Sequence, residues 1–173
     1  MLDEEARLSV LYRYRILETP REEDFDDIVA LVAQVLGAPI AAINLIDRHR
    51  QWFKAEIGLG VREMPLDDSI CKFALLQSGG MVIPDLTEDE RFSCNPLVSE
   101  GPNLRFYAGE LLNTAEGLPL GTLCVLDTKA RPEGLTDQQR FALKALAKQV
   151  MAQLELRLAL YEQATLIEQQ KAT

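Results

Sequence analysis

The run Ile40-Ala41-Ala42-Ile43-Asn44-Leu45-Ile46 carries apolar side chains on both of its alternating faces. A strand with this pattern is covered by other parts of a protein on both sides, so the run predicts a buried strand of a sheet. The polar stretch 47–50 predicts a tight turn after it, and residues 51–56 predict the antiparallel partner strand. A covered hairpin is therefore expected near the centre of the fold.

Helical patterns precede this hairpin, and a mixture of strand and helix patterns follows it. Helices are expected at about 3–17, from Thr19 to Gly37, at 70–77 and from Thr136 onward. Further strands are expected at 81–83, 104–112 and 118–127, with a polar connection at 84–100. This order predicts an α+β domain in which helices are grouped around an antiparallel sheet.

Two helix starts carry capping signals. Thr19 is a good N-cap residue, and Pro20 and Glu22 follow at the positions that favour a first helical turn. Thr136 with Gln139 forms a second capping box. Both helices are expected to begin at these threonines.

The last helix carries two apolar stripes. One stripe, expected to pack on the sheet, comprises Phe141, Leu143, Leu146 and Val150. A second follows alternating steps of four and three residues and comprises Ala147, Met151, Leu154, Leu158 and Tyr161. Such steps are typical of a coiled-coil seam, so we expect a sensor body at 1–150 and a dimerising signalling helix at 151–173. The alternative is a long core helix with a frayed end.

Composition and charge exclude several classes of protein. The 173 residues carry a net charge of −9, which disfavours binding to nucleic acid and to anionic membrane surfaces. The uncharged stretch 28–46 is interrupted by Gly37 and Pro39, so no membrane span is expected. Three cysteines without a CxxC pair do not resemble a zinc site or a disulfide framework. Because residues 3–5 are acidic where a signal peptide would be basic, we expect a cytoplasmic protein.

The ordered local strings resemble the GAF family of sensory domains. They are Arg15 to Pro20 with Phe25-Asp26, Pro39 to Asp47, Arg50 to Lys54, Ser69-Ile70-Cys71, Asp89 to Phe92, Asn95 to Val98, Arg105 to Gly109, and Gly121 to Asp127. The similarity is closest to the N-terminal GAF domains of bacterial sensor histidine kinases and diguanylate cyclases. It implies a GAF-like (profilin-like) antiparallel sheet. Terminal helices would pack on one face and mediate dimers, and a helix-loop segment would cover a pocket on the other face.

The resemblance places candidate pocket residues on several elements. The candidates are Trp52, Phe53, Cys71, Phe73, Asp85, Arg105, Tyr107 and Cys124. The aromatic members could form an apolar wall, and Arg105 or Lys54 could hold an anionic group. The alternative is that the aromatic residues belong to the core and that Arg105 pairs with a nearby acid such as Asp85 or Asp89.

Cys71 is the strongest candidate for a chemically reactive residue. It lies near the start of a predicted short helix, where the helix dipole favours a thiolate. Lys72 follows it, whereas bilin-binding relatives resemble Cys-His at this point, so no covalent bilin is expected. A redox pair with Cys124 or Cys94 is conceivable, and so is a buried cysteine that only packs.

No set of catalytic residues is expected, because the chain has one histidine and lacks phosphate-binding glycine motifs. No metal site is expected either. The function expected first is a non-catalytic small-molecule sensor. It would act as a homodimer on an effector, such as a histidine kinase or a diguanylate cyclase, in cis or in trans. The alternatives are a thiol-based redox enzyme or switch centred on Cys71, resembling free methionine sulfoxide reductases, and a ligand-free dimerisation module.

Overall fold

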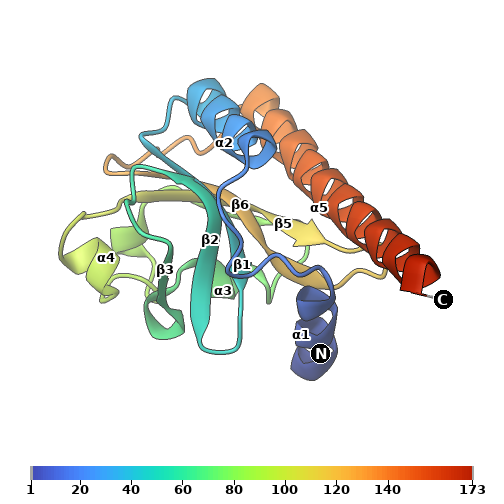
Figure 1. The fold of residues 1–173 in the computed structure, drawn as a ribbon. Helices are drawn as coiled ribbons and strands as arrows, with labels where there is room; N and C mark the ends of the chain where they lie inside the picture. Colours follow the sequence, from blue (N-terminus) through green and yellow to red (C-terminus); the bar gives the residue numbers. More distant parts are fainter. Residues whose placement is uncertain (1, 173) are drawn as a thin grey trace.

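The computed structural model describes residues 2–172, and its centre is a six-stranded antiparallel sheet (Figure 1). The strands are β1 (Ile40–Ile46), β2 (Arg50–Ile57), β3 (Glu63–Pro65), β4 (Met81–Ile83), β5 (Phe106–Asn113) and β6 (Pro119–Asp127). They lie in the order β3-β2-β1-β6-β5-β4. The predicted α+β class and the predicted central hairpin are confirmed. The edge strand β3 was not predicted, because Glu63-Met64-Pro65 combines a charged residue and a proline and lacks the apolar run that marked β4.

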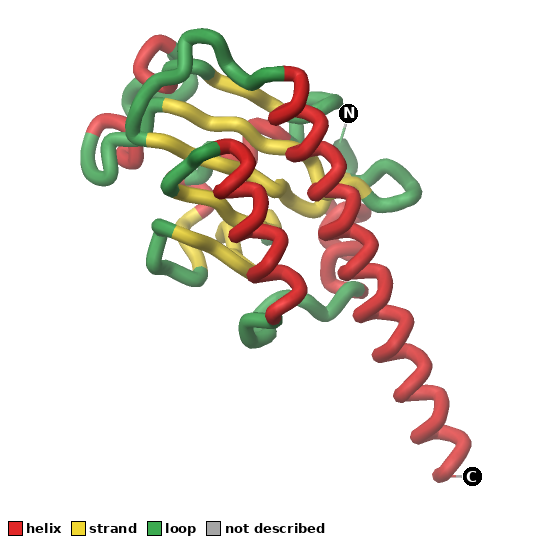
Figure 2. Tube along the Cα trace, turned by 90° about the horizontal axis from the view of Figure 1, so that it is seen from above, coloured by secondary structure: helices red, strands yellow, loops and turns green. Residues whose placement is uncertain are grey.

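Helices lie on both sides of this sheet. The long ones are α2 (Glu23–Leu36) and α5 (Asp137–Ala172), which lie side by side over one face (Figure 2). The opposite face carries short elements and loops, namely η1 (Leu66–Asp68), α3 (Cys71–Ala74), η2 (Leu86–Glu88) and α4 (Pro96–Ser99). The first helix, α1 (Glu4–Arg13), packs at the start of β6, where Arg7 donates to the backbone oxygen of Pro119. Among the described residues, none of these helices combines the length and apolar character that a membrane crossing requires.

The two faces of the sheet bury two separate apolar cores. All seven residues of β1 are buried, as the alternation of its apolar side chains predicted. Ile43, Trp52 and Phe106 belong to the core under α2 and α5, which we call the helix-side core. Phe53 and Tyr107 belong to the core under α3 and α4, which we call the pocket-side core.

The capping predictions had opposite outcomes. At α5, the backbone N–H of Thr136 donates to Gln139 (3.0 Å) and that of Gln139 donates to Thr136 (3.1 Å), so this capping box is confirmed. At α2, the N-cap position is Glu22, and the prediction that Thr19 caps the helix is wrong. The Thr19 hydroxyl donates to the carbonyl of Ile16 and accepts from Lys54 instead.

The first helix is shorter than predicted. It ends at Arg13 rather than near Leu17. Arg15 has a φ of 53°, in the left-handed region that no α-helix continues through. The chain therefore turns two residues after the helix ends and leads into α2.

The predicted pairing seam on α5 is wrong for four of its five residues. Ala147, Met151, Leu154 and Leu158 are buried in the helix-side core of their own chain. Tyr161 is 45% exposed, and the guanidinium of Arg15 lies 4.5 Å from its ring centroid. The body of the domain therefore continues to Leu158, beyond the expected boundary at 150.

The first predicted stripe of α5 also needs one correction. Leu143 and Val150 are buried and Leu146 is partly buried against the helix-side core, as expected. Phe141 is 75% exposed. Helical spacing alone did not distinguish it from the residues that face the sheet.

Gly121 allows β1 and β6 to approach each other closely. A Cβ atom at this position would lie 1.9 Å from the backbone oxygen of Asn44. Neither strand can move aside freely, because both are paired with another strand on their other edge. The position therefore requires glycine for lack of space.

Replacing Gly121→Ala is expected to destabilise the domain by about 2–3 kcal/mol, because the added methyl group forces two central strands apart. Urea denaturation measures the change. The matched control is Gly101→Ala, where a Cβ meets no atom within 4 Å and where we expect a change within about 0.5 kcal/mol. Equal stability of the two variants would contradict the close approach.

Candidate functional site

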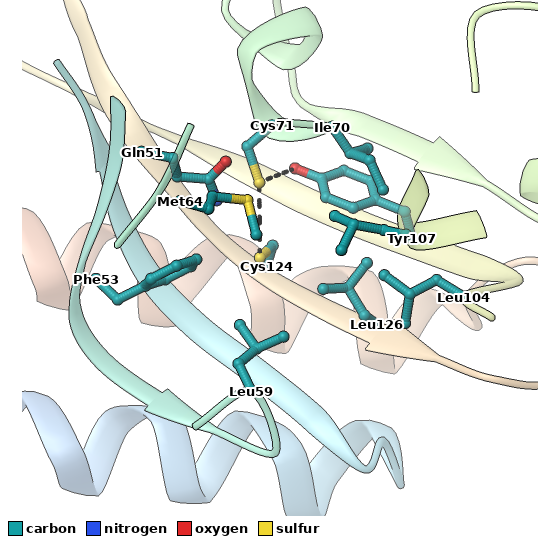
Figure 3. A pocket seen from close by; sticks show the side chains of 11 residues that line it. Gln51, Phe53, Leu59, Met64, Ile70, Cys71, Leu104, Tyr107, Cys124 and Leu126 are labelled. Carbon is teal, nitrogen blue, oxygen red and sulfur yellow. Dashed lines mark hydrogen bonds between the residues drawn. The ribbon is translucent and has the colours of Figure 1, made fainter. Parts of the chain in front are cut away.

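A small cavity lies between the sheet and the segment that covers its pocket-side face. About 20 Å³ of it is open to the centre of a water molecule, which is room for about one water. Most of the wall is apolar and includes Phe53, Leu59, Met64, Leu104 and Leu126 (Figure 3). A polar end is formed by Cys71, Tyr107 and Cys124. Any larger ligand therefore requires the covering segment to move.

Buried Ser69 holds the start of α3 over the sheet. Its hydroxyl donates to the side chain of Gln51 on β2 and accepts from the backbone N–H of Lys72 (3.1 Å). The amide of Asn95 donates to the backbone oxygen of Asp68 (3.1 Å) and connects the same segment to α4. These contacts place Cys71, the first residue of α3, above the centre of the sheet.

Five buried polar side chains meet beneath α3. The hydroxyl of Tyr107 lies 3.2 Å from the Sγ of Cys71, and the Sγ of Cys124 lies 3.8 Å from it (Figure 3). The Nδ2 of Asn44 donates to Thr122 (2.8 Å) and approaches the sulfurs of Cys71 (3.4 Å) and Cys124 (3.6 Å). Asn44 and Thr122 are opposite each other in the pairing of β1 with β6. We call these five residues the thiol cluster.

The pKa values of the two thiols are shifted in opposite directions. Burial disfavours the thiolate of Cys71, but hydrogen bonds from Cys124, Thr122, Tyr107 and Asn44 outweigh burial and lower its pKa to about 7. The hydrogen bond to Cys71, together with burial, raises the pKa of Cys124 well above its usual value. Burial and the nearby charge of Cys71 likewise raise the pKa of Tyr107. The arrangement therefore favours one thiolate beside one protonated thiol.

Gly109 makes room for the phenol of Tyr107. These residues are two apart on β5 and so share a face of the sheet. A Cβ atom at Gly109 would lie 2.3 Å from the Tyr107 hydroxyl. Glycine at 109 thus allows that hydroxyl to reach Cys71.

Four of the eight predicted pocket residues line the cavity. They are Phe53, Cys71, Tyr107 and Cys124. Asn44 and Thr122, the other polar members of the thiol cluster, were not predicted. A signal was present, because both are polar residues within runs that read as buried strands, and Thr122 is two residues from Cys124.

The other two predicted aromatic residues lie elsewhere. Trp52 is on the opposite face of the sheet, in the helix-side core, with the guanidinium of Arg62 5.0 Å from its ring centroid. Phe73 packs edge-on against Phe92, with 5.1 Å between the ring centroids, and does not line the cavity. The prediction of a pocket wall is wrong for both, since their side chains are engaged in packing.

The predicted charged contacts are also absent from the cavity. Asp85 accepts from the backbone N–H of Thr87 (3.0 Å) at the start of η2, on the surface. Arg105 precedes β5 and donates to the backbone oxygen of Val98 (2.8 Å). Both predictions are wrong for this cavity, because each side chain stabilises the loop in which it lies. Within residues 2–172, no three potential metal ligands gather at one place.

Lys54 faces the helices instead of the cavity. On β1, Ile43 pairs with Ala55 of β2 and Asn44 pairs with Phe53. Lys54 therefore has no partner on β1 and forms a bulge. Its fully buried ammonium donates to Glu22 (2.5 Å) and Thr19 (2.9 Å). Glu22 also accepts from Arg157 of α5 (2.8 Å). The suggestion that Lys54 holds an anionic ligand is therefore wrong, and its charge joins the sheet to both long helices.

Comparison with known proteins gives a family match over most of the chain. A family model described as "GAF domain" matches residues 20–154. A cyclic di-GMP phosphodiesterase of Pseudomonas aeruginosa is 41% identical over 152 residues. That match covers 88% of this chain but 26% of the relative. The chain thus spans about a quarter of the length of this curated relative.

Solved structures share the fold at low sequence identity. The GAF domain of a phosphoenolpyruvate-protein phosphotransferase from Coxiella burnetii superimposes with a TM-score of 0.66 at 14% identity, covering 91% of this chain and 97% of that one. A free methionine-R-sulfoxide reductase from Neisseria meningitidis, solved with its substrate, gives a TM-score of 0.60 at 17% identity, covering 95% of each chain. At these identities the likeness establishes the fold and no more.

Replacing Gly109→Ala is expected to raise the pKa of Cys71 from about 7 toward the ordinary thiol value of 9.0, because the new methyl group displaces the Tyr107 hydroxyl that stabilises the thiolate. Ultraviolet absorbance of the thiolate across a pH titration, in a Cys94→Ser background, measures the shift. Tyr107→Phe should move the inflection in the same direction. An unchanged inflection in both variants would show that the hydroxyl has no part in the acidity of Cys71.

Proposed function

The chain belongs to the GAF domain family, and from this we propose that it is a non-catalytic sensor domain that controls an effector through α5. Its stimulus would be a small molecule or a chemical change at the pocket. The effector would respond to the position of α5. A stimulus acts in this way only if it favours one arrangement of the helix over another.

The observation that carries this proposal is the position of the sheet between the cavity and α5. Tyr107 on β5 and Cys124 on β6 line the cavity from one face. Phe106 and Val125, their sequence neighbours, face the helix-side core that α5 covers. A displacement of these two strands at the cavity therefore changes the surface on which α5 rests.

A second connection joins the sheet to α5 through charge. Glu22 accepts hydrogen bonds from both Lys54 of β2 and Arg157 of α5. Burial alone would raise the pKa of Glu22, but the hydrogen bonds and charges of these two partners outweigh it and lower the pKa below 4.5. The charged network thus couples the position of α5 to β2, the strand that contains Phe53.

We further propose that two copies pair through the solvent-facing side of α5. Phe141, Leu156, Leu160 and Ile167 are each at least 45% exposed. At 100° per residue they lie within about 100° of arc, on the side of the helix opposite the buried stripe. Between residues 141 and 167 the remaining positions of that arc are all alanine or glutamine, at residues 142, 145, 149, 152, 159 and 163. An apolar face without charges, in a chain of net charge −9, favours contact with a second protein surface.

In each copy, α2 would contribute to the same pairing surface as α5. Leu31 and Val35 on α2 are 47% and 44% exposed. They are one helical turn apart and add to the apolar surface of the helix layer shown in Figure 2. This exposed surface replaces the stripe from Ala147 to Tyr161, four of whose five residues are buried, as the expected pairing surface.

The effector would be a cytoplasmic signalling enzyme. The relative named as a cyclic di-GMP phosphodiesterase supports an effector that makes or degrades this nucleotide, and a histidine kinase is the other candidate. We place the domain in the cytoplasm. We assign it no nucleic-acid or membrane partner, because a net charge of −9 disfavours both kinds of binding. No covalent bilin is proposed, because Lys72 follows the buried Cys71.

An enzymatic role as a free methionine sulfoxide reductase is the alternative. Against it, Cys71 is 2% exposed and the cavity holds about one water, which leaves no room for an amino-acid substrate. Incubation with methionine sulfoxide and a thiol reductant is expected to leave the substrate intact, as chromatography would show. Turnover that disappears in Cys71→Ser would instead favour the enzyme.

The double variant Leu156→Glu with Leu160→Glu is expected to convert the dimer into a monomer, because two carboxylates would be buried in the apolar contact. Sedimentation equilibrium measures the mass, and the affinity should fall at least about 100-fold. Glu162→Lys, an exposed change on another side of the same helix, is the control and should keep the dimer. A wild-type chain that stays monomeric at high concentration would contradict the proposed pairing.

A further inference from the structure

We propose that Cys71 and Cys124 are a peroxide-reactive thiol pair, in which hydrogen peroxide oxidises Cys71 and Cys124 converts the product into an intramolecular disulfide. The inference deepens the proposed sensor function, since it assigns a chemical class to the stimulus. It rests on that function only for its regulatory consequence. The thiol chemistry stands on the geometry of the cluster alone.

The two sulfurs are close enough to react but are not bonded. Their Sγ atoms are 3.8 Å apart, and the cysteines are 2% and 1% exposed. A disulfide requires about 2 Å. Cys71 lies on α3, a single helical turn between loops, whereas Cys124 lies within a central strand. A small movement of α3 toward the sheet therefore closes the gap without breaking the pairing of strands.

The surroundings assign different roles to the two thiols. Cys71 lies 3.2 Å from the Tyr107 hydroxyl and 3.4 Å from the Nδ2 of Asn44. Two donors at this distance stabilise an anion on sulfur, and a thiolate is the form of cysteine that attacks peroxide. Cys124 has a longer contact of 3.6 Å with Asn44. Cys71 is therefore the residue that attacks the oxidant first, and Cys124 is the residue that completes the disulfide.

The cavity next to the sulfurs selects the size of the oxidant. Cys71 and Cys124 both line it, and its volume of about 20 Å³ admits a molecule not much larger than water. Hydrogen peroxide meets that limit, whereas bulky hydroperoxides do not. The Oδ1 of Asn44 is a buried acceptor that lacks a hydrogen-bond partner in the described part of the chain. It belongs to the amide that contacts both sulfurs, so a small O–H donor near them would satisfy it.

The chemistry balances with hydrogen peroxide as the only added reagent. The thiolate of Cys71 attacks one peroxide oxygen and the O–O bond breaks. The departing hydroxide takes up the proton that the Cys71 thiol released and leaves as water. Cys71 is now a sulfenic acid. The sulfur of Cys124 then attacks the sulfur of Cys71, and the hydroxide that leaves takes the Cys124 proton to form a second water. Two thiols are oxidised to one disulfide and one peroxide is reduced to two waters.

The new bond would act on the strands that support α5. It joins α3 to β6, and β6 faces α5 on its other side. The cavity would shrink, since both cysteines form part of its wall. Oxidation therefore reaches the helix by the same route that we propose for any pocket stimulus.

The test uses the complete chain with Cys94→Ser, which removes the exposed third thiol. After treatment with hydrogen peroxide, thiols are counted under denaturing conditions and the intact mass is measured. We expect both remaining thiols to disappear, with the loss of two hydrogen atoms and no intermolecular bond. Adding Cys124→Ser should leave a sulfenic acid at Cys71, which dimedone traps when the protein is denatured in its presence. Adding Cys71→Ser should leave Cys124 reduced, and Cys71→Ala serves as the alternative if that variant fails to fold.

Two further readouts separate this chemistry from nonspecific oxidation. Tyr107→Phe should slow the loss of thiols about tenfold at neutral pH, the effect of removing one charge-assisted hydrogen bond from the thiolate. tert-Butyl hydroperoxide should react more slowly than hydrogen peroxide, because it does not fit the cavity. Persistence of both thiols, or equal oxidation rates of Cys71 and Cys124 in the single-cysteine variants, would overturn the inference.

Failure of the thiol pair can be distinguished from failure of the proposed sensor function. Hydrogen exchange along α5 and the oligomeric state are compared between reduced and oxidised protein. A disulfide that forms without any change in α5 upholds the thiol pair and refutes the relay through the helix. A chain that pairs through α5 but forms no disulfide refutes the thiol pair and leaves the sensor role intact.

Discussion

The close contact between β1 and β6 is the constraint on which the rest of the molecule depends. Gly121 permits a backbone separation that no other residue allows, and both strands are buried on both faces. The pairing places Asn44 opposite Thr122, and Cys124 then follows two residues along the same face. The polar groups beneath α3 are therefore held by main-chain hydrogen bonding, and only Cys71 is supplied by a segment outside the sheet.

Most of the fold was predictable because its signals are local. The run 40–46 showed a doubly covered strand, and Thr136 with Gln139 marked the start of α5 without reference to the remaining structure. Thr19 failed as a helix cap because a distant residue, the buried Lys54, takes its hydroxyl as a hydrogen-bond acceptor. A competing long-range partner of this kind leaves no mark in the sequence around Thr19.

The site was predictable only in part, for a related reason. Cys71, Tyr107 and Cys124 were recognised, but the faces on which Trp52 and Phe53 lie depend on the register of β2 against β1, which the bulge at Lys54 shifts. Trp52 and Phe53 are adjacent, so one faces each core, and the sequence offered no means to choose between them. The stripe of α5 was misassigned in the same way. Its spacing is equally suitable for a second helix and for the chain's own sheet, and the broad helix-side core extends to Leu158.

The unbroken length of α5 has a consequence for whatever follows it. Fourteen residues continue after Leu158 as a regular helix, which corresponds to about 21 Å at 1.5 Å per residue. A helix of this kind conveys rotation as well as displacement, so a following domain is oriented by angular phase. Inserting one residue would turn such a domain by about 100° relative to the sensor, whereas inserting seven would return it close to its starting direction. Fusions that join different effectors at this point must therefore be matched in helical phase, and a mismatched junction could lock an intact effector on or off.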